Sequence, residues 1–213
     1  MEIKIESLPV DYAKAMLQME EIHGKVLLEE TQEIAWLLEH FDIYTKGISA
    51  KDDELLSNSV PVCETKRGGK FTYHGAGQQV CYLMVNLKKR ATKMPDIRRY
   101  VNCLEEIVIQ TLVEFGIRAK RKEGYIGIWV ENNGIDEKIG AIGVKFSKGV
   151  TMHGFALNVC PNLEKFKNII PCGISEFGVC SMKSLGVNCT MQEVRQKIIE
   201  KINWANSVNF YQT

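Results

Sequence analysis

The chain has 213 residues, of which 45% are hydrophobic and 25% are charged, and its formal net charge is +1. This length suits one catalytic domain over residues 1–213, large enough to bury roughly 70% of the unfolded chain's surface and to hold a deep pocket. The near-neutral charge argues against a nucleic-acid-binding protein, which usually carries a strong basic excess.

The compartment can be predicted from the apolar runs and the cysteines. Every apolar run is far shorter than the ~20 residues of a membrane-spanning helix. Residues 1–6 are charged and lack the apolar region of a signal peptide. The seven cysteines are odd in number, and no two have C-x-x-C spacing. We therefore expect a cytoplasmic protein without a disulfide framework, a metal site or a membrane partner.

The N-terminal half shows one amphipathic helix and several strand patterns. Apolar residues at helical spacing predict a helix over residues 11–30. A short apolar run predicts a buried strand over 33–38, and two further strands are expected over 60–65 and 79–86. The stretch 67–78, between the last two strands, is rich in glycine.

The C-terminal half contains two more helices separated by strands. An apolar stripe predicts a helix over residues 97–115, and a last helix is expected over 191–204 with Thr190 as its N-cap. Three strands are expected between them: residues 126–130, 139–146 and 150–159. Helices and strands alternate irregularly, which favours an α+β fold: a mixed β-sheet flanked by helices.

The glycine-bearing stretch is the first segment with chemical potential. It reads R-G-G-K-F-T-Y-H-G-A-G-Q over residues 67–78, and its four glycines allow a ligand to approach the backbone closely. Arg67 and His74 add polar groups. A glycine-rich hairpin that binds nothing explains the pattern equally well. No G-x-x-x-x-G-K-[ST] phosphate loop occurs in the chain.

Two further segments hold a lysine and a cysteine that are candidates for catalysis. Lys138 precedes a run of small and apolar residues, where partial loss of hydration makes a lysine proton more available. Cys172 stands between Pro171 and Gly173, which would present its thiol rigidly. A solvated lysine and an inert buried cysteine are the competing interpretations. For His153, in the segment after Lys138, the competing interpretation is a structural histidine whose hydrogen bonds are satisfied within the fold.

Together these segments resemble the lipoyl(octanoyl) transferase family. The family pattern is R-G-G-x-x-T-Y-H-G-x-G-Q, then K-[IV]-x-[AS]-I-G, then T-x-H-G-F-A-L-N, then P-C-G-I. All four pieces stand in this chain in that order, and the similarity extends over roughly residues 35–180. The resemblance implies the fold of lipoate ligases and biotin protein ligases, with no cofactor.

The resemblance also implies a catalytic pair and a substrate site. Cys172 would carry an acyl-thioester intermediate and Lys138 would be its partner. The substrate-binding residues would be Arg67, Gly68, Gly69, Lys70, Phe71, Thr72, Tyr73, His74, Ala141, Ile142, Gly143, Gly154, Phe155 and Ala156. Three positions depart from the commonest pattern: Lys70 replaces glutamine, Ala76 replaces proline, and Gly140 replaces alanine. We expect the first two to affect how the glycine-bearing stretch closes.

The implied reaction moves an octanoyl chain from octanoyl-acyl carrier protein to Cys172, and then to a lysine of an acceptor protein. The acceptors would be the lipoyl domains of 2-oxoacid dehydrogenase complexes and the glycine cleavage H protein. One alternative is an ATP-dependent lipoate-protein ligase of the same fold, and another is an inactive binding module. The P-C-G cysteine favours transfer from a thioester, and a covalent intermediate predicts ping-pong kinetics.

Three geometric expectations follow. Residues 67–74 and 154–156 should line one pocket, with Gly68, Gly69 and Gly154 against the substrate. Phe71, Phe155 and Leu157, with residues 75–78, should line a tunnel for the acyl chain. The ammonium group of Lys138 should lie roughly 3 to 4 Å from the sulfur of Cys172.

Overall fold

The centre of the structure is a mixed β-sheet. The structure is a computed structural model, and it describes residues 1–57, 59–91, 94–170 and 177–208. The strands lie in the order β1-β2-β6-β10-β9-β8-β7, and β11 pairs with β9 beside this path. The strands are β1 (Glu2–Ile5), β2 (Ile34–Leu38), β6 (Gln78–Met84), β7 (Ala119–Lys122), β8 (Tyr125–Asn132), β9 (Ile135–Ser147), β10 (Val150–Asn158) and β11 (Gly178–Val179). The β1–β2 and β11–β9 pairs are parallel, and the others are antiparallel.

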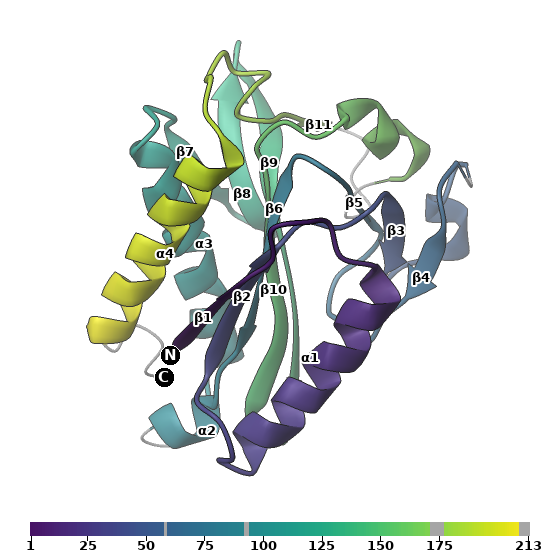
Figure 1. Ribbon diagram of the computed structural model, residues 1–213. Coiled ribbons are helices and arrows are strands. Elements are labelled where there is room, and N and C mark those ends of the chain that lie inside the picture. Colours follow the sequence, from purple (N-terminus) through teal and green to yellow (C-terminus); the bar gives the residue numbers. More distant parts are fainter. Residues whose placement is uncertain (58, 92–93, 171–176, 209–213) are drawn as a thin grey trace.

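A second, three-stranded sheet lies beside one end of the main sheet (Figure 1). Its order is β4-β3-β5, formed by β3 (Ile43–Lys46), β4 (Val62–Glu64) and β5 (Thr72–His74). Tyr44, Phe71 and Tyr73 form its own apolar cluster together with Phe166 and Ile169. The glycine-bearing segment therefore belongs to this small sheet, which holds it against the main one.

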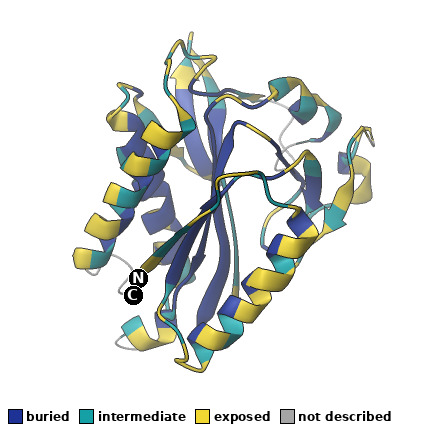
Figure 2. Ribbon diagram, viewed as in Figure 1, coloured by how far each residue is buried: buried dark blue, intermediate teal, exposed yellow. Residues whose placement is uncertain are grey.

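Helices cover both faces of the main sheet (Figures 1 and 2). Helix α1 (Tyr12–Leu27) packs on β6 and β10 from one side. Helices α3 (Ile97–Val113) and α4 (Met191–Ser207) pack against each other and against the opposite face. The shorter helices are α2 (Leu87–Arg90), η1 (Asp52–Glu54) and η2 (Leu163–Asn168). None of the helices in the described ranges is long and apolar enough to cross a membrane.

Side-chain caps fix where the three long helices begin. Asp11 accepts a hydrogen bond from the backbone N–H of Lys14 at 3.0 Å, and Asp96 caps α3 in the same way. Thr190 and Glu193 form a reciprocal capping box at the start of α4. The first turn of each helix thus has partners for donors that would otherwise be unsatisfied. The predicted N-cap at Thr190 is confirmed.

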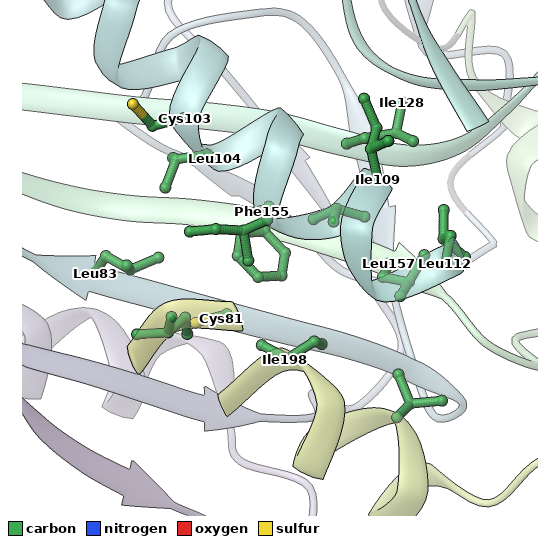
Figure 3. Close-up of a cluster of buried hydrophobic side chains, with 14 of the residues drawn as sticks. Cys81, Leu83, Cys103, Leu104, Ile109, Leu112, Ile128, Phe155, Leu157 and Ile198 are labelled. Atoms are coloured by element: carbon green, nitrogen blue, oxygen red, sulfur yellow. The ribbon is translucent and has the colours of Figure 1, made fainter. Parts of the chain in front are cut away.

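The larger apolar core lies between the sheet and helices α3 and α4. Figure 3 shows Phe155 and Leu157 of β10 facing Leu104 and Leu112 of α3, with Ile198 of α4 close by. All five side chains are buried. A smaller core lies between the other face of the sheet and α1. Burial on both faces explains why β2 and β6 consist of buried residues throughout, rather than alternating with polar ones.

Two tight turns join the three longest strands. Lys148 and Gly149 have φ values of 53° and 97°, and Asn133 and Gly134 have 51° and 79°. Two consecutive residues with positive φ are the mark of the hairpin turn that matches strand twist, so the turn predicted at Lys148-Gly149 is confirmed. The prediction that Lys138 precedes a strand is wrong, because β9 already begins at Ile135.

Candidate active site

A cleft opens where the small sheet, the start of α1 and strands β6, β9 and β10 meet. It is lined by residues 67, 69–72 and 74 of the glycine-bearing segment, by 141–143 of β9, and by 154–156 of β10. Tyr12, Val80, Tyr82 and His153 complete the lining. The prediction that the glycine-bearing segment and residues 154–156 share one pocket is therefore confirmed.

Three residues expected at the ligand do not line this cleft. The hydroxyl of Tyr73 donates to Asp42 at 2.7 Å, and its ring is buried in the cluster of the small sheet. Gly68 donates its backbone N–H to the carbonyl of Val144 at 2.9 Å. Leu157 packs in the core between the sheet and α3, so the prediction that it lines an acyl tunnel is wrong.

Gly69 and Gly154, which both line the cleft, are also required by the fold itself. A Cβ added at Gly154 would lie 2.3 Å from the carbonyl oxygen of Cys81 on the neighbouring strand β6. Gly69 has a φ of 86°, a conformation that side chains rarely adopt. The close approach of strands and a backbone turn thus favour glycine at these two positions, and their predicted contact with a substrate stays a prediction.

Arg67 stabilises the wall of the cleft. Its guanidinium donates to the carbonyl oxygens of Thr45, Gly68 and Lys70 at 2.8 to 3.0 Å, and also to the Thr45 hydroxyl. The side chain is buried. A rigid fork of N–H donors can hold several carbonyls at once, so Arg67 fixes the conformation of residues 67–70.

Two buried histidines, His74 and His153, line the cleft, and a third, His40, lies against His74; all three are neutral at pH 7. Burial lowers the pKa of His40 to about 4 and that of His153 to about 3. Burial also lowers the pKa of His74 well below its usual value, and the nearby His40 adds to this effect. His40 donates from Nδ1 to the carbonyl of Val10 and accepts at Nε2 from the Tyr82 hydroxyl. Neutral rings keep the cleft compatible with an apolar ligand.

His153 has an unusual conformation. Its φ is 60°, although it lies inside β10 and keeps the register with Val144 of β9. Its Nε2 atom is buried and has no hydrogen-bond partner among the described residues. Left-handed backbone in a non-glycine residue is costly and gathers at functional sites. The cleft thus presents one buried polar atom on a strained residue.

Lys138 lies in a hollow that adjoins the cleft. It is 7% exposed, its Nζ donates to the carbonyl of Ile126 at 2.9 Å, and it lies 5.3 Å from the centre of the Trp129 ring. Thr72 and Ala141 line both this hollow and the cleft. The cleft and the hollow of the buried lysine therefore share a wall.

A chain of hydrogen-bonded side chains connects the cleft with the hollow. His74 Nδ1 lies 2.7 Å from Gln78 Oε1, Gln78 donates to Asn158 Oδ1 at 2.9 Å, and Asn158 donates to the carbonyl of Cys180 at 3.0 Å. Gln78 and Asn158 line the hollow that contains Lys138. Gln78 is predicted only in the tunnel and Asn158 has no predicted role, although both residues stand in the sequence patterns that carry the resemblance.

Cys172 lies outside the described residues, so its predicted distance from Lys138 stays a prediction. The chain that follows residue 176 is described. Val179 pairs with Lys138 across β11 and β9, and the ring of Phe177 lies 5.4 Å from that of Trp129. Before the undescribed segment, the N–H of Ile170 binds the carbonyl of Glu54 at 2.8 Å.

The three departures from the family pattern have different settings. Lys70 forms an ion pair with the buried Glu54, so it joins the glycine-bearing segment to η1. Ala76 is exposed. A Cβ at Gly140 would lie 3.0 Å from Cδ1 of Ile128, which explains why glycine fits this position.

Comparisons with known proteins show the family of the chain. The Lipoyl protein ligase A/B catalytic domain family matches residues 11–203. An octanoyltransferase from Ehrlichia ruminantium is 46% identical over 194 residues, which cover 91% of this chain and 92% of that protein.

Solved structures of ligases share the fold. A lipoate protein ligase from Thermoplasma acidophilum has a TM-score of 0.71 at 16% identity, over 98% of this chain and 84% of that one. A biotin protein ligase from Aquifex aeolicus has a TM-score of 0.52 at 13% identity, over 99% and 69%. The predicted fold, a mixed sheet with helices as in these ligases, is confirmed. The chain therefore belongs to the Lipoyl protein ligase A/B catalytic domain family, within its group of octanoyltransferases.

Proposed function

We propose that this acyltransferase moves an octanoyl group from octanoyl-acyl carrier protein to a lysine of a lipoyl-accepting protein, through a thioester on Cys172. The observation that carries the proposal is the position of Lys138, a buried lysine that shares the Thr72–Ala141 wall with the neighbouring cleft. A lysine of this kind can supply both a positive charge and a proton beside a bound acyl carbonyl. The relationship to octanoyltransferases supports the same reaction.

The first half of the reaction forms the acyl-enzyme. An ordinary thiol is only a few per cent thiolate at neutral pH, and a neighbouring ammonium increases that fraction. The thiolate of Cys172 attacks the carbonyl carbon of the donor, a carbon–sulfur bond to the enzyme forms, and the bond to the carrier's sulfur breaks. The ammonium of Lys138 gives its proton to the departing thiolate of the carrier.

The second half transfers the acyl group to nitrogen. The acceptor's lysine, as a neutral amine, attacks the acyl-thioester on Cys172 and loses one proton to the now neutral amine of Lys138. An amide bond forms, the bond to the enzyme's sulfur breaks, and the pair returns to thiolate and ammonium. The acceptors we propose are lipoyl domains of 2-oxoacid dehydrogenase complexes and the glycine cleavage H protein.

The cleft is suited to the octanoyl chain. Phe71, Val80 and Ala156 provide apolar walls, and the histidines beneath them carry no charge at pH 7. Each buried CH₂ group stabilises binding by about 0.8 kcal/mol, so a cleft of fixed depth discriminates between chain lengths. The six described cysteines are free thiols, which supports the proposed cytoplasmic location.

Intact mass spectrometry tests the proposal most directly. The protein is incubated with octanoyl-acyl carrier protein without ATP or magnesium, and we expect one octanoyl group to be added. Cys172→Ala should abolish the addition, whereas Cys160→Ala, which replaces an exposed cysteine, should not. If acyl transfer requires ATP and free octanoate or lipoate, the protein is a ligase like those whose fold it shares, and the proposal is wrong.

A further inference from the structure

We infer that Glu105 positions Lys138 through the peptide group between Ile126 and Gly127. The carbonyl oxygen of this peptide accepts from Lys138 Nζ at 2.9 Å, and its N–H donates to Glu105 Oε1 at 2.9 Å. A trans peptide is planar, and its C=O and N–H point in opposite directions. The carboxylate on one side therefore fixes the direction of the carbonyl that holds the ammonium on the other.

Glu105 is itself firmly held. It lies on the inner face of α3 and is 4% exposed, and its second oxygen accepts from Arg121 Nε at 3.1 Å. Arg121 also binds the carbonyl of Asn102 at 2.8 Å and the carboxylate of Glu106 at 2.7 Å. Hydrogen bonds to a charged acceptor are roughly twice as strong as neutral ones. The N–H of Gly127 is thus bound to a rigid, charged partner.

Gly127 brings the peptide into contact with the lysine. Its φ of 132° is a conformation that favours glycine, and an added Cβ would lie 2.4 Å from Cε of Lys138. The pairing of β8 with β9 shifts register between Ile128 and Trp129, so Ile139 has no partner at this point. Such a bulge changes the direction of neighbouring side chains. Sequence and backbone thus bring Lys138 and this peptide into contact.

The arrangement has an electrostatic consequence as well as a geometric one. The negative charge of Glu105 lies behind the peptide dipole, whose carbonyl end faces the ammonium of Lys138. Hydrogen bonds in such a chain polarise one another in a low-dielectric interior. An alternative explanation is that Glu105 only anchors the β7–β8 hairpin to α3, and its ion pair with Arg121 could do that without Lys138.

Steady-state kinetics separate these two explanations. The inference rests on the proposed function, in which Lys138 is catalytic. Misplacement of a catalytic group by 1 Å can lower the rate about 100-fold. We expect Glu105→Leu and Gly127→Ala to lower kcat by about 10- to 100-fold with KM for octanoyl-acyl carrier protein changed less than about twofold. Glu105→Gln keeps an acceptor for Gly127 and should recover most of kcat. Glu106→Gln, which also loses a contact with Arg121, should match wild type.

A double-mutant cycle gives a readout that an anchoring role would not change. The rate of Cys172 alkylation is measured against pH in wild type, Glu105→Leu, Lys138→Ala and the double variant, each checked for folding by circular dichroism. We expect Glu105→Leu to move the midpoint to higher pH in the wild-type background and to have no effect in the Lys138→Ala background. Equal shifts in both backgrounds, or an unchanged kcat in folded Glu105→Leu, would overturn the inference. If Lys138→Ala itself keeps full turnover, the proposed function fails instead.

Discussion

The three buried histidines under the cleft should make the protein unstable in mild acid. Each has a folded-state pKa below the value of ~6.5 that it has in the unfolded chain. Below that pH the unfolded chain binds protons that the folded protein does not, so stability falls as the pH falls. The loss begins near pH 6.5 and continues until the folded-state values are reached.

The size of the effect follows from the lowered pKa values of His40 and His153. With folded-state pKa values of about 4 for His40 and about 3 for His153, linkage gives a loss of about 1 kcal/mol from each between pH 7 and pH 5.5. His74 contributes in the same direction. A total of about 2 kcal/mol or more is a large part of the ~5–15 kcal/mol that stabilises a typical domain.

Urea unfolding at pH 5.5, 6.0, 6.5 and 7.0 measures this loss, and His153→Asn is the informative variant. Asparagine tolerates the φ of 60° at this position and does not titrate. The variant should lose about 1 kcal/mol less than wild type over the same range. Carboxylates with lowered pKa values change the stability mainly below about pH 4.5, so they do not obscure the comparison. A wild type with constant stability, or a variant with an unchanged slope, would refute the reasoning.

Three further predictions concern the site and its walls. Lys138→Arg should retain faster Cys172 alkylation at neutral pH than Lys138→Ala but lose turnover, because a guanidinium keeps its proton; equal turnover in wild type and Lys138→Ala would contradict the catalytic pair. Gly154→Ala should destabilise the fold by about 2 kcal/mol or more in thermal unfolding, because the added Cβ would lie 2.3 Å from a backbone oxygen. An unchanged melting temperature would show that the two strands move apart at little cost. Lys70→Gln should cost about 1–2 kcal/mol, because it removes the charged partner of buried Glu54; an equal loss when Glu54 is already replaced by glutamine would show that the ion pair is not the cause.

Local sequence patterns predicted most of the long elements. Helices α1, α3 and α4 carry apolar stripes and side-chain caps, both of which are local signals. The predicted helix over residues 11–30 ends early, because Glu29 adopts a φ of 60°. Strands β2, β6, β8 and β10 were also expected. Each of these elements contains enough apolar residues to reveal its period without knowledge of the fold.

The elements missed by the sequence analysis depend on distant partners. Strand β7 has the polar sequence A-K-R-K. It forms a strand because it pairs with β8 at the edge of the sheet. Strand β1 is only four residues long and is held by parallel pairing with β2. Strands β3 and β5 form a sheet whose partners are separated by a long loop. No local pattern contains this information.

The candidate site also contains some residues that the sequence predicts and others that only the fold brings together. The glycine-bearing segment and residues 154–156 were expected to share a pocket because the resemblance joined them, and they do. Glu105 and Gly127 could not be found from the sequence, since a glutamate in an amphipathic helix and a glycine near a strand are both common. Their relation to Lys138 arises only when α3, β8 and β9 pack together.

The wall formed by Thr72 and Ala141 limits how this protein could change its substrate range. Because both residues line the cleft and the hollow of Lys138, a larger side chain at either position would shorten the space for the acyl chain and crowd the lysine at once. Val80 borders only the cleft. In the proposed reaction, a larger side chain at Val80 would therefore narrow the cleft without crowding the lysine, whereas the same change in volume at Ala141 would do both.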